Sequence, residues 1–369
     1  MGLNGSMTVL TESSETQFLD AVDVVLTGFF ARGRAGTSGL PATVGQLWDA
    51  LASSATGGKR IRPRLLLSVV DGYGGGPAGT SDGAGWSPED PAVVTAAALE
   101  LLHTALVTHD DVIDHDFVRR GKPNVAGIYR RRAAADGFDA AAANERGQAA
   151  AIIAGDVALA AAYRLVASTR ARQLPVLLDL MDAAVHSAAA GELLDVEYSG
   201  HLRVPSAEVV LQTALLKTAI YSFDVPLQAG AVLAGAPAEE RQLLCRVGQD
   251  IGTAYQLVDD LLGVFGHESA TGKTTTGDLT AIKHTLLLSH AVRQPGWPSV
   301  APLLTGAGSR TDVETLRDFL VASGARAYVQ TMAREYAERA RDAVAGSSLP
   351  VALRADLGVL IDAAVDRVR

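Results

Sequence analysis

Two aspartates four residues apart, Asp110 and Asp114, close a long apolar stretch of the sequence. On a helix this spacing places both carboxylates on one face, one turn apart. Adjacent carboxylates repel each other unless a cation lies between them. Oxygen-only donors suit Mg²⁺, which completes its shell with water and phosphate. The alternative is an ordinary solvated helix end, and the pair alone does not decide between the two.

The residues that follow favour the metal site. Arg119 and Arg120 come directly before a Gly-Lys-Pro turn that can fold back toward the aspartates. Guanidinium groups pair bidentately with phosphate oxygens. Acids that bind a cation beside arginines that bind an anion indicate a metal–diphosphate site.

A second acidic pair, Asp259 and Asp260, ends another apolar stretch, with Gln256 about one turn before Asp259. A carboxylate is a stronger Mg²⁺ ligand than a neutral amide, so Asp259 is the expected metal contact. Gln256 is better suited to point its carbonyl dipole at a developing cation. Packing alone is a poor explanation for two apolar helices that both end in Asp-Asp.

Basic residues in glycine-containing contexts supply further candidates for phosphate binding. The segment GGKRIRP places Lys59 and Arg62 three residues apart after two glycines, which suits a second diphosphate. Each lysine alone would be read as a surface charge, but the motif contexts favour binding. The remaining candidates are Lys217, Lys273 and Lys283.

The elements that must position these residues are helical. Apolar residues make up 48% of the 369-residue chain and aromatic ones only 5%. Alanine and leucine dominate, and no alternating strand pattern of useful length is present. We therefore predict an all-α fold: a flexible tail over 1–15, then one large helical bundle over 16–369 around a central active-site cavity. The expected helices are 15–30, 43–54, 63–70, 91–114, 148–169, 173–198, 206–219, 223–235, 238–263, 280–293, 311–321, 325–345 and 350–367. The expected loops are 72–86, 118–126, 200–205, 265–279 and 294–310.

Composition excludes some classes of protein. The formal charge of −9 argues against a nucleic-acid binder. Cys245 is the only cysteine, so no intramolecular disulfide can form, and a reduced, cytoplasmic setting is the expectation. The acidic residues in the first thirty positions argue against a signal peptide, and no apolar run reads as a membrane span.

Several motifs together resemble one family. They are GGKRIRP, DDVID with its trailing RRGKP, GDVAL at 155–159, KTA at 217–219 and YQLVDD at 255–260. Their order and spacing are similar to those of the trans-polyprenyl (isoprenyl) diphosphate synthases, most of all the bacterial geranylgeranyl diphosphate synthases. The resemblance implies a Mg²⁺-dependent prenyltransferase that condenses isopentenyl diphosphate with an allylic diphosphate, and a homodimer.

The resemblance also assigns residue roles. It implies three Mg²⁺ ions held by Asp110, Asp114 and Asp259. The allylic diphosphate would be bound by Arg119, Lys217 and Lys273, and Lys283 is placed among the substrate-binding residues. Isopentenyl diphosphate would be bound by Lys59, Arg62, His103 and Arg120. The groups that stabilise the carbocation would be the Lys217 carbonyl, Thr218 and Gln256.

Two positions depart from the family pattern. Gly263 stands where many members carry a third aspartate of the second motif, with His267 and Glu268 close behind it. Glu192 stands where many relatives have glutamine.

Product length is expected to depend on the residues before Asp110. Ala105 and Leu106 lie about 6 Å along the helix from it, and Leu101 and Leu102 about 12 Å. No aromatic side chain blocks the first level, which favours a C20 product over C15. A phenylalanine at position 105 is therefore expected to shorten the main product in a product assay.

Three alternatives remain at this stage. The same chemistry can give a farnesyl (C15) product or one of C25 or longer. A class I terpene cyclase would need an Asn/Ser/Glu motif, whereas the chain has no asparagine after Asn144 and carries the GGKRIRP segment. A non-catalytic partner subunit should have lost its Asp-rich motifs, and both are retained.

Overall fold

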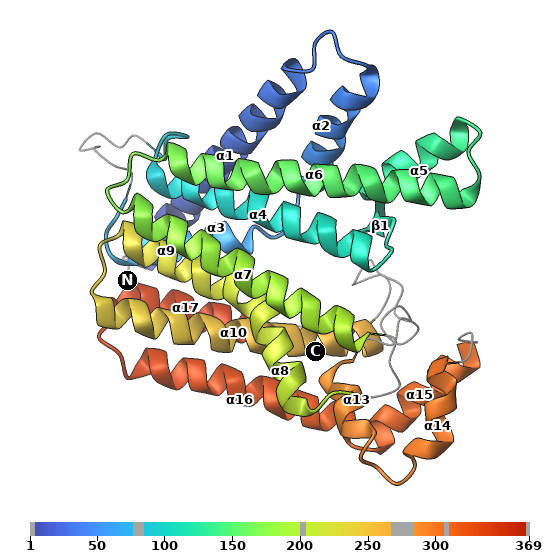
Figure 1. Cartoon of the computed structure of the whole chain (residues 1–369). Helices are drawn as coiled ribbons and strands as arrows, with labels where there is room; N and C mark the ends of the chain where they lie inside the picture. Colours follow the sequence, from blue (N-terminus) through green and yellow to red (C-terminus); the bar gives the residue numbers. More distant parts are fainter. Residues whose placement is uncertain (1–3, 77–84, 200–203, 267–283, 306–309, 367–369) are drawn as a thin grey trace. The chain divides into compact units, whose positions relative to one another are not determined.

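The alanine- and leucine-rich sequence forms helices almost throughout (Figure 1). The structure, a computed structural model, describes residues 4–76, 85–199, 204–266, 284–305 and 310–366. The all-α prediction is confirmed. The only strands among these residues are a two-residue pair, β1 (Val118–Arg119) and β2 (Lys122–Pro123), which are antiparallel.

The described residues form two compact units. Unit 1 is Met1–Asp182 with Pro226–Arg241, and unit 2 is Ala183–Val225 with Gln242–Arg369. The division falls inside the helices α7 (Leu174–Tyr198) and α10 (Ala238–Phe265). The assignment of residues 1–15 to a tail and 16–369 to one domain stays a prediction.

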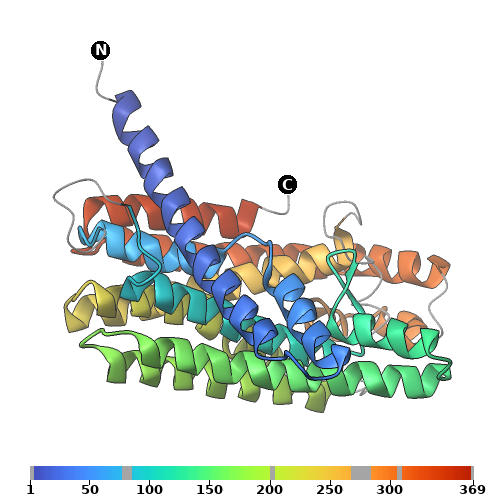
Figure 2. The ribbon, with the colours of Figure 1, turned by 90° about the horizontal axis from the view of Figure 1, so that it is seen from above.

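Unit 1 is built around α4 (Pro91–Ile113), which is among its most deeply buried elements. α4 packs against α6 (Ala140–Ser168), and the two run side by side in Figure 1. The other helices of this unit that contact α4 are α1 (Asn4–Ala35), α2 (Ala42–Ala55), α3 (Ile61–Gly72) and α5 (Val125–Ala135). α1 and α2 pair with each other. Figure 2 shows that the first turns of α1 project beyond the part that lies beside α2.

Local signals explain where several of these helices start. Pro91 occupies the first turn of α4, where its missing N–H costs nothing. The Asn124 side chain caps α5 by accepting from the Gly127 amide at 2.8 Å. It also donates to the Asp116 carbonyl at 2.8 Å, which fixes the short hairpin before the helix.

Unit 2 has its own core, formed by the second half of α10 and the C-terminal helices. Its elements after α7 are α8 (Ala207–Ala214), the π-helix η1 (Leu215–Asp224), and then α13 (Leu286–Ala291), α14 (Trp297–Thr305), α15 (Arg310–Ala322), α16 (Ala325–Ala345) and α17 (Val351–Val365). η1 continues directly into α9 (Val225–Leu233), most of which belongs to unit 1.

Glycines of α10 allow it to approach η1 closely. A Cβ atom added at Gly252 would lie 2.5 Å from the Ala219 Cα, and one at Gly248 would lie 2.6 Å from the Asp224 Cα. Both distances are too short for any larger residue. Backbone-to-backbone packing therefore fixes the π-helical segment against α10.

The structure differs from the sequence expectations in five features. The expected loop 294–310 contains α14, and the expected loop 118–126 contains the β1–β2 hairpin. α5 was not predicted, and α8, η1 and α9 form one continuous helical run with no break near residue 220. α1 begins at Asn4 instead of near Glu15. Tertiary contacts decide such short or polar segments, and these contacts leave little trace in local sequence.

Two helices are long and apolar enough to pass a composition test for membrane spans. They are α4, with 78% of the tested window buried, and α6, with 44%. Helices in the core of a soluble protein pass the same test, and α4 is buried by its protein neighbours.

The close contact at Gly252 generates a stability prediction. Gly252→Ala is expected to lower the free energy of unfolding by about 2 kcal/mol, because the new methyl group meets the Ala219 backbone. Gly358→Ala in α17 is the matched control, since no atom lies within 4 Å of its added Cβ. It should raise stability by about 0.5–1 kcal/mol through helix propensity. Urea unfolding measures both, and equal effects would contradict the packing argument.

Candidate active site

The first aspartate cluster lies at the C-terminal end of α4. Asp110 and Asp114 are both half-buried, whereas Asp111 between them is only 4% exposed. Several α4 positions that keep some exposure, together with the C-cap Asp114, repeat with helical spacing and form one stripe along the helix. They are His103, Leu106, Val107, Asp110, Ile113 and Asp114, whereas His109 and Val112 are also partly exposed but lie off this stripe.

Arg119 is held by this cluster. Its guanidinium lies 2.7 Å from Asp111 Oδ1 and 3.0 Å from Asp110 Oδ2. Burial raises the pKa of Asp111, and the Arg119 charge opposes that rise. Asp111 therefore anchors Arg119, while Asp110 and Asp114 stay on the accessible stripe. The sequence spacing had already placed Asp111 on a different face.

Arg120 is brought to the GGKRIRP segment by the hairpin. Arg120 and Gly121 form its two-residue turn, with φ of 53° and 72°, as a type I′ turn requires. A Cβ atom at Gly58 would lie 3.0 Å from the Arg120 guanidinium, and the φ of 94° at Gly58 favours glycine there. The loop next to exposed Lys59 thus meets the turn that follows the first aspartate cluster.

His103 lies where these cationic groups converge. Burial holds the pKa of its ring well below its ordinary value of 6.5. The positive charges that lower this pKa further belong to Arg62, Arg119, Arg120 and Arg60. Four arginines thus act on one neutral imidazole in unit 1, and such a group of cations suits a multiply charged anion.

The predicted residues of unit 2 form a second cluster. Lys217 lies on η1, and its Nζ is 2.9 Å from Glu192 and 2.6 Å from Asp195 of α7. Gly191 lies directly against the Lys217 backbone, since an added Cβ would be 2.3 Å from its nitrogen. A π-helix is rare and is often found at functional sites.

Thr218 and Gln256 are hydrogen-bonded to each other. Thr218 Oγ1 donates to Gln256 Oε1 at 2.7 Å, and Gln256 Nε2 donates to Asp260 Oδ1 at 2.8 Å. This chain of bonds fixes which way the Gln256 amide points. Asp259, which directly precedes Asp260 in α10, is exposed.

Oxygen donors suited to a metal are present, although within the described ranges no three His, Cys, Asp or Glu side chains are grouped to hold an ion. Asp110 and Asp114 fit Mg²⁺ in particular, because it binds through one or two carboxylates and takes its other ligands from water and substrate phosphate. Gly263 lies within α10, one turn after Asp259, and offers no ligand.

Several functional candidates were missed from sequence. Arg60 and Glu100 contact each other in unit 1, and Asp195 holds Lys217 in unit 2. Arg60 stands between Lys59 and Arg62 and could have been found from its motif, whereas Glu100 and Asp195 carry no sequence signal. Asp260 is part of the second acidic pair, but its contact with Gln256 was not predicted. Lys273, Lys283, His267 and Glu268 lie outside the described residues.

Known proteins share this sequence pattern and this fold. A family model described as polyprenyl synthetase matches residues 46–300, more than half of the chain. The chain belongs to the polyprenyl synthetase family. It is therefore a trans-prenyl diphosphate synthase, a transferase of prenyl groups whose substrates are isoprenoid diphosphates.

Individual relatives of this synthase differ in the product for which they are named. It is 33% identical to a geranylfarnesyl diphosphate synthase of Aeropyrum pernix, covering 85% of this chain and 91% of the relative. It is 30% identical to the octaprenyl diphosphate synthase of Escherichia coli, covering 77% and 78%. A geranylgeranyl pyrophosphate synthase from Corynebacterium glutamicum, complexed with isoprenyl diphosphate and magnesium, has the same fold. Its TM-score is 0.84 at 29% identity, with 95% of this chain and 99% of that chain covered.

The low pKa of His103 generates a pH prediction. The unfolded chain takes up a proton at this position below about pH 6.5, and the folded chain does not. Folding stability is therefore lost as pH falls below 6.5. The free energy of unfolding of the parent, relative to His103→Gln, should fall by up to about 1.4 kcal/mol per pH unit there. Urea titrations at pH 8, 6.5 and 5.5 measure this, and a constant difference between the two proteins would contradict it.

Proposed function

We propose that this synthase is Mg²⁺-dependent and condenses isopentenyl diphosphate head-to-tail with an allylic diphosphate, giving mainly geranylgeranyl diphosphate. The observation that carries the proposal is the convergence of Arg60, Arg62, Arg119 and Arg120 around neutral His103, on the helix that ends in Asp110 and Asp114. A positive cluster beside oxygen donors suits a diphosphate and its divalent cation.

The proposed roles follow from the chemistry of each side chain. Asp110, Asp114 and Asp259 bind three Mg²⁺ ions, which when bound balance the charge on the departing diphosphate. Arg119, Lys217 and Lys273 bind the allylic diphosphate, with Lys283 nearby in sequence. Lys59, Arg62, His103 and Arg120 bind isopentenyl diphosphate. His103 is neutral, so it donates one hydrogen bond without adding a fifth positive charge.

The reaction needs no nucleophilic side chain. The C–O bond of the allylic diphosphate breaks, and the diphosphate leaves with the electron pair. The alkene of isopentenyl diphosphate attacks the resulting allylic cation, forming the new C–C bond, and a proton then passes to the released diphosphate. Carbonyl and hydroxyl dipoles of Lys217, Thr218 and Gln256 stabilise the cation. Thr218 and Asp260 hold the Gln256 amide in place for this role.

The contacts of Lys217 and Arg119 suit a binding site in its substrate-free state. Each cation is paired with two carboxylates, so neither is left as an isolated charge before substrate binds. Glu192 contributes one of the two acids at Lys217 where many relatives have glutamine. When substrate binds, the diphosphate with its metal ions takes the place of these carboxylates as the partner of Lys217 and Arg119.

Purified protein tests the proposal directly. It is mixed with Mg²⁺, isopentenyl diphosphate and a C5, C10 or C15 allylic diphosphate, and the products are identified by chromatography. The expected result is a C20 product and no reaction when EDTA removes the metal. Cyclic hydrocarbons without consumption of isopentenyl diphosphate would indicate a terpene cyclase. No turnover at all would indicate a non-catalytic subunit and would reject the proposal.

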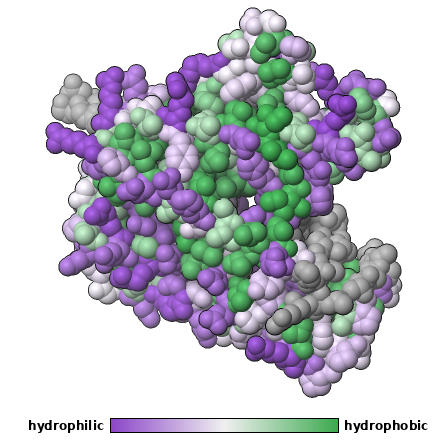
Figure 3. All heavy atoms as spheres, viewed as in Figure 1, coloured by the Kyte–Doolittle hydropathy of each residue, from purple (hydrophilic) through white to green (hydrophobic). Residues whose placement is uncertain are grey.

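A homodimer in the cytoplasm completes the proposal. α6 exposes Ile152 and Ile153, at 47% and 55%, and Figure 3 shows hydrophobic side chains among hydrophilic ones on that face of the molecule. An apolar strip of this kind suits a partner helix from a second copy. Light scattering after size exclusion would give the mass of the purified chain, and a monomer mass would reject the dimer.

The accessible stripe of α4 sharpens the prediction of product length. Leu106 lies on the stripe one turn before Asp110, whereas Ala105 has no exposed surface. Leu106→Phe is therefore expected to shift the main product from C20 to C15, with at least about a fivefold change in product ratio. Ala105→Phe, expected from sequence to act in the same way, would also overpack the core by about 1–3 kcal/mol. An unchanged product pattern in folded Leu106→Phe would show that the tail does not pass this residue.

A further inference from the structure

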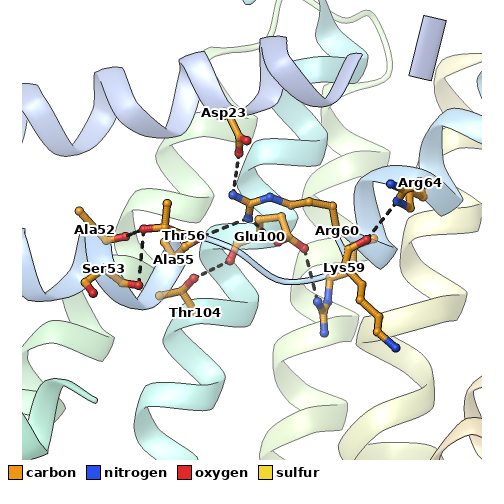
Figure 4. Close-up of polar contacts among 11 residues, drawn as sticks. Asp23, Ala52, Ser53, Ala55, Thr56, Lys59, Arg60, Arg64, Glu100 and Thr104 are labelled. Atoms are coloured by element: carbon orange, nitrogen blue, oxygen red, sulfur yellow. Dashed lines mark hydrogen bonds and ion pairs between the residues drawn. The ribbon is translucent and has the colours of Figure 1, made fainter. Parts of the chain in front are cut away.

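Glu100 is a carboxylate buried in unit 1, with its side chain 8% exposed. It lies on α4, three residues before His103 and so on the same side of the helix. Its Oε2 accepts from Arg60 at 2.8 Å, and its Oε1 accepts from Arg62 at 3.4 Å (Figure 4). One buried acid thus serves both arginines of the GGKRIRP segment.

Arg60 makes three contacts with other parts of unit 1. Its guanidinium donates to Asp23 of α1 at 2.6 Å and to the Ala55 carbonyl at 3.1 Å, in addition to Glu100. Figure 4 shows it extending between α1, α4 and the end of α2. Its backbone has φ of 48°, a left-handed conformation that is uncommon for a residue with a side chain. These contacts hold the Arg60 guanidinium against α1, α2 and α4, so its main role is structural.

Arg62 has a different environment. Its side chain is 10% exposed, and its contact with Glu100 is 0.6 Å longer than that of Arg60. A guanidinium carries five N–H donors, and the Glu100 carboxylate contacts one of those of Arg62, which limits how the group can turn. Without an acid between them, two buried guanidiniums two residues apart would repel each other.

We propose that Glu100 is a positioning residue for isopentenyl diphosphate. It holds Arg60 in the scaffold and orients Arg62 toward the substrate, so that the two arginines of one motif have separate roles. The inference rests on the proposed function, in which Lys59 and Arg62 bind the diphosphate of isopentenyl diphosphate. Glu100 itself does not touch the substrate.

Steady-state kinetics of Glu100→Gln test the proposal, with the KM of each substrate measured at saturation by the other. The substitution keeps the shape of the side chain and removes its charge. We expect the KM for isopentenyl diphosphate to rise about tenfold, while the KM for the allylic substrate and kcat change by less than about twofold. An unchanged KM for isopentenyl diphosphate in the folded variant, or an equal rise in both KM values, would overturn the proposal.

Two further carboxylates provide a rescue and a matched control. Glu100→Asp keeps the charge and should recover a substantial part of the lost affinity for isopentenyl diphosphate; no recovery would count against orientation by charge. Glu15 pairs with Arg64, which lies on the same helix as Arg62 but has an exposed side chain. Glu15→Gln should therefore leave both KM values unchanged, and a change like that of Glu100→Gln would overturn the proposal.

Asp23→Asn covers the case in which Glu100→Gln fails to fold, which circular dichroism would reveal. The Asp23 side chain is 55% exposed, so its removal disturbs Arg60 without burying an unpaired charge. We expect a rise of about twofold in the KM for isopentenyl diphosphate alone. If that selective rise is absent, Arg60 and Glu100 do not position the site.

Arg62→Gln separates this inference from the proposed function. If it leaves the KM for isopentenyl diphosphate unchanged, the proposed ligand set is wrong. If it raises that KM and Glu100→Gln does not, only the positioning role of Glu100 is wrong. The double variant should match Arg62→Gln alone, because Glu100 acts through Arg62. Additive effects of the two substitutions would contradict that dependence.

Discussion

Repulsion between like charges is the constraint on which the rest of this site depends. A diphosphate site needs several cations close together, and unit 1 gathers four arginines around His103. Arginine cannot lose its proton in a protein, so relief must come from acids or from burial of a neutral partner. Glu100, Asp110 and Asp111 supply the acids. Burial, and after it the charges of the arginines, lowers the pKa of His103, so its ring stays neutral.

Unit 2 also balances charges, but there the carboxylates outnumber the cation. Lys217 contacts two carboxylates, and Gln256 is fixed between Thr218 and Asp260. In the proposed function, Lys217 exchanges these carboxylates for a diphosphate, and the Gln256 amide is already oriented. Fixed dipoles are effective in catalysis because they do not have to reorganise when charge develops. The close packing of Gly248 and Gly252 against η1 makes that orientation rigid.

Short backbone devices bring the charged groups together. The positive φ values of Arg60, Arg120 and Gly58 allow a loop and a hairpin turn to meet. The φ of 94° favours glycine at position 58, where the Arg120 guanidinium lies close by. The conformational cost of these turns is offset by ion pairs at the buried acids Glu100 and Asp111.

Much of the site could be predicted from sequence. The helical fold follows from an alanine- and leucine-rich composition with helical spacing, and aspartates four residues apart must share a face of α4. The motif order of Lys59, Arg62, Asp110 and Asp259 identified the family. Local geometry explains the shared face, because the spacing of two residues along a helix determines the direction in which their side chains point.

Tertiary structure alone decided which charged residues bind each other. Glu100 and Arg60 are forty positions apart, as Asp195 and Lys217 are twenty-two, and no local pattern pairs them. Burial separated Asp111 from Asp110 and Ala105 from Leu106, although each pair is adjacent in sequence. The sequence by itself determined what chemistry the chain carries. The folded packing determined which groups are held for structure and which remain accessible, because the energy of a charge depends on everything around it.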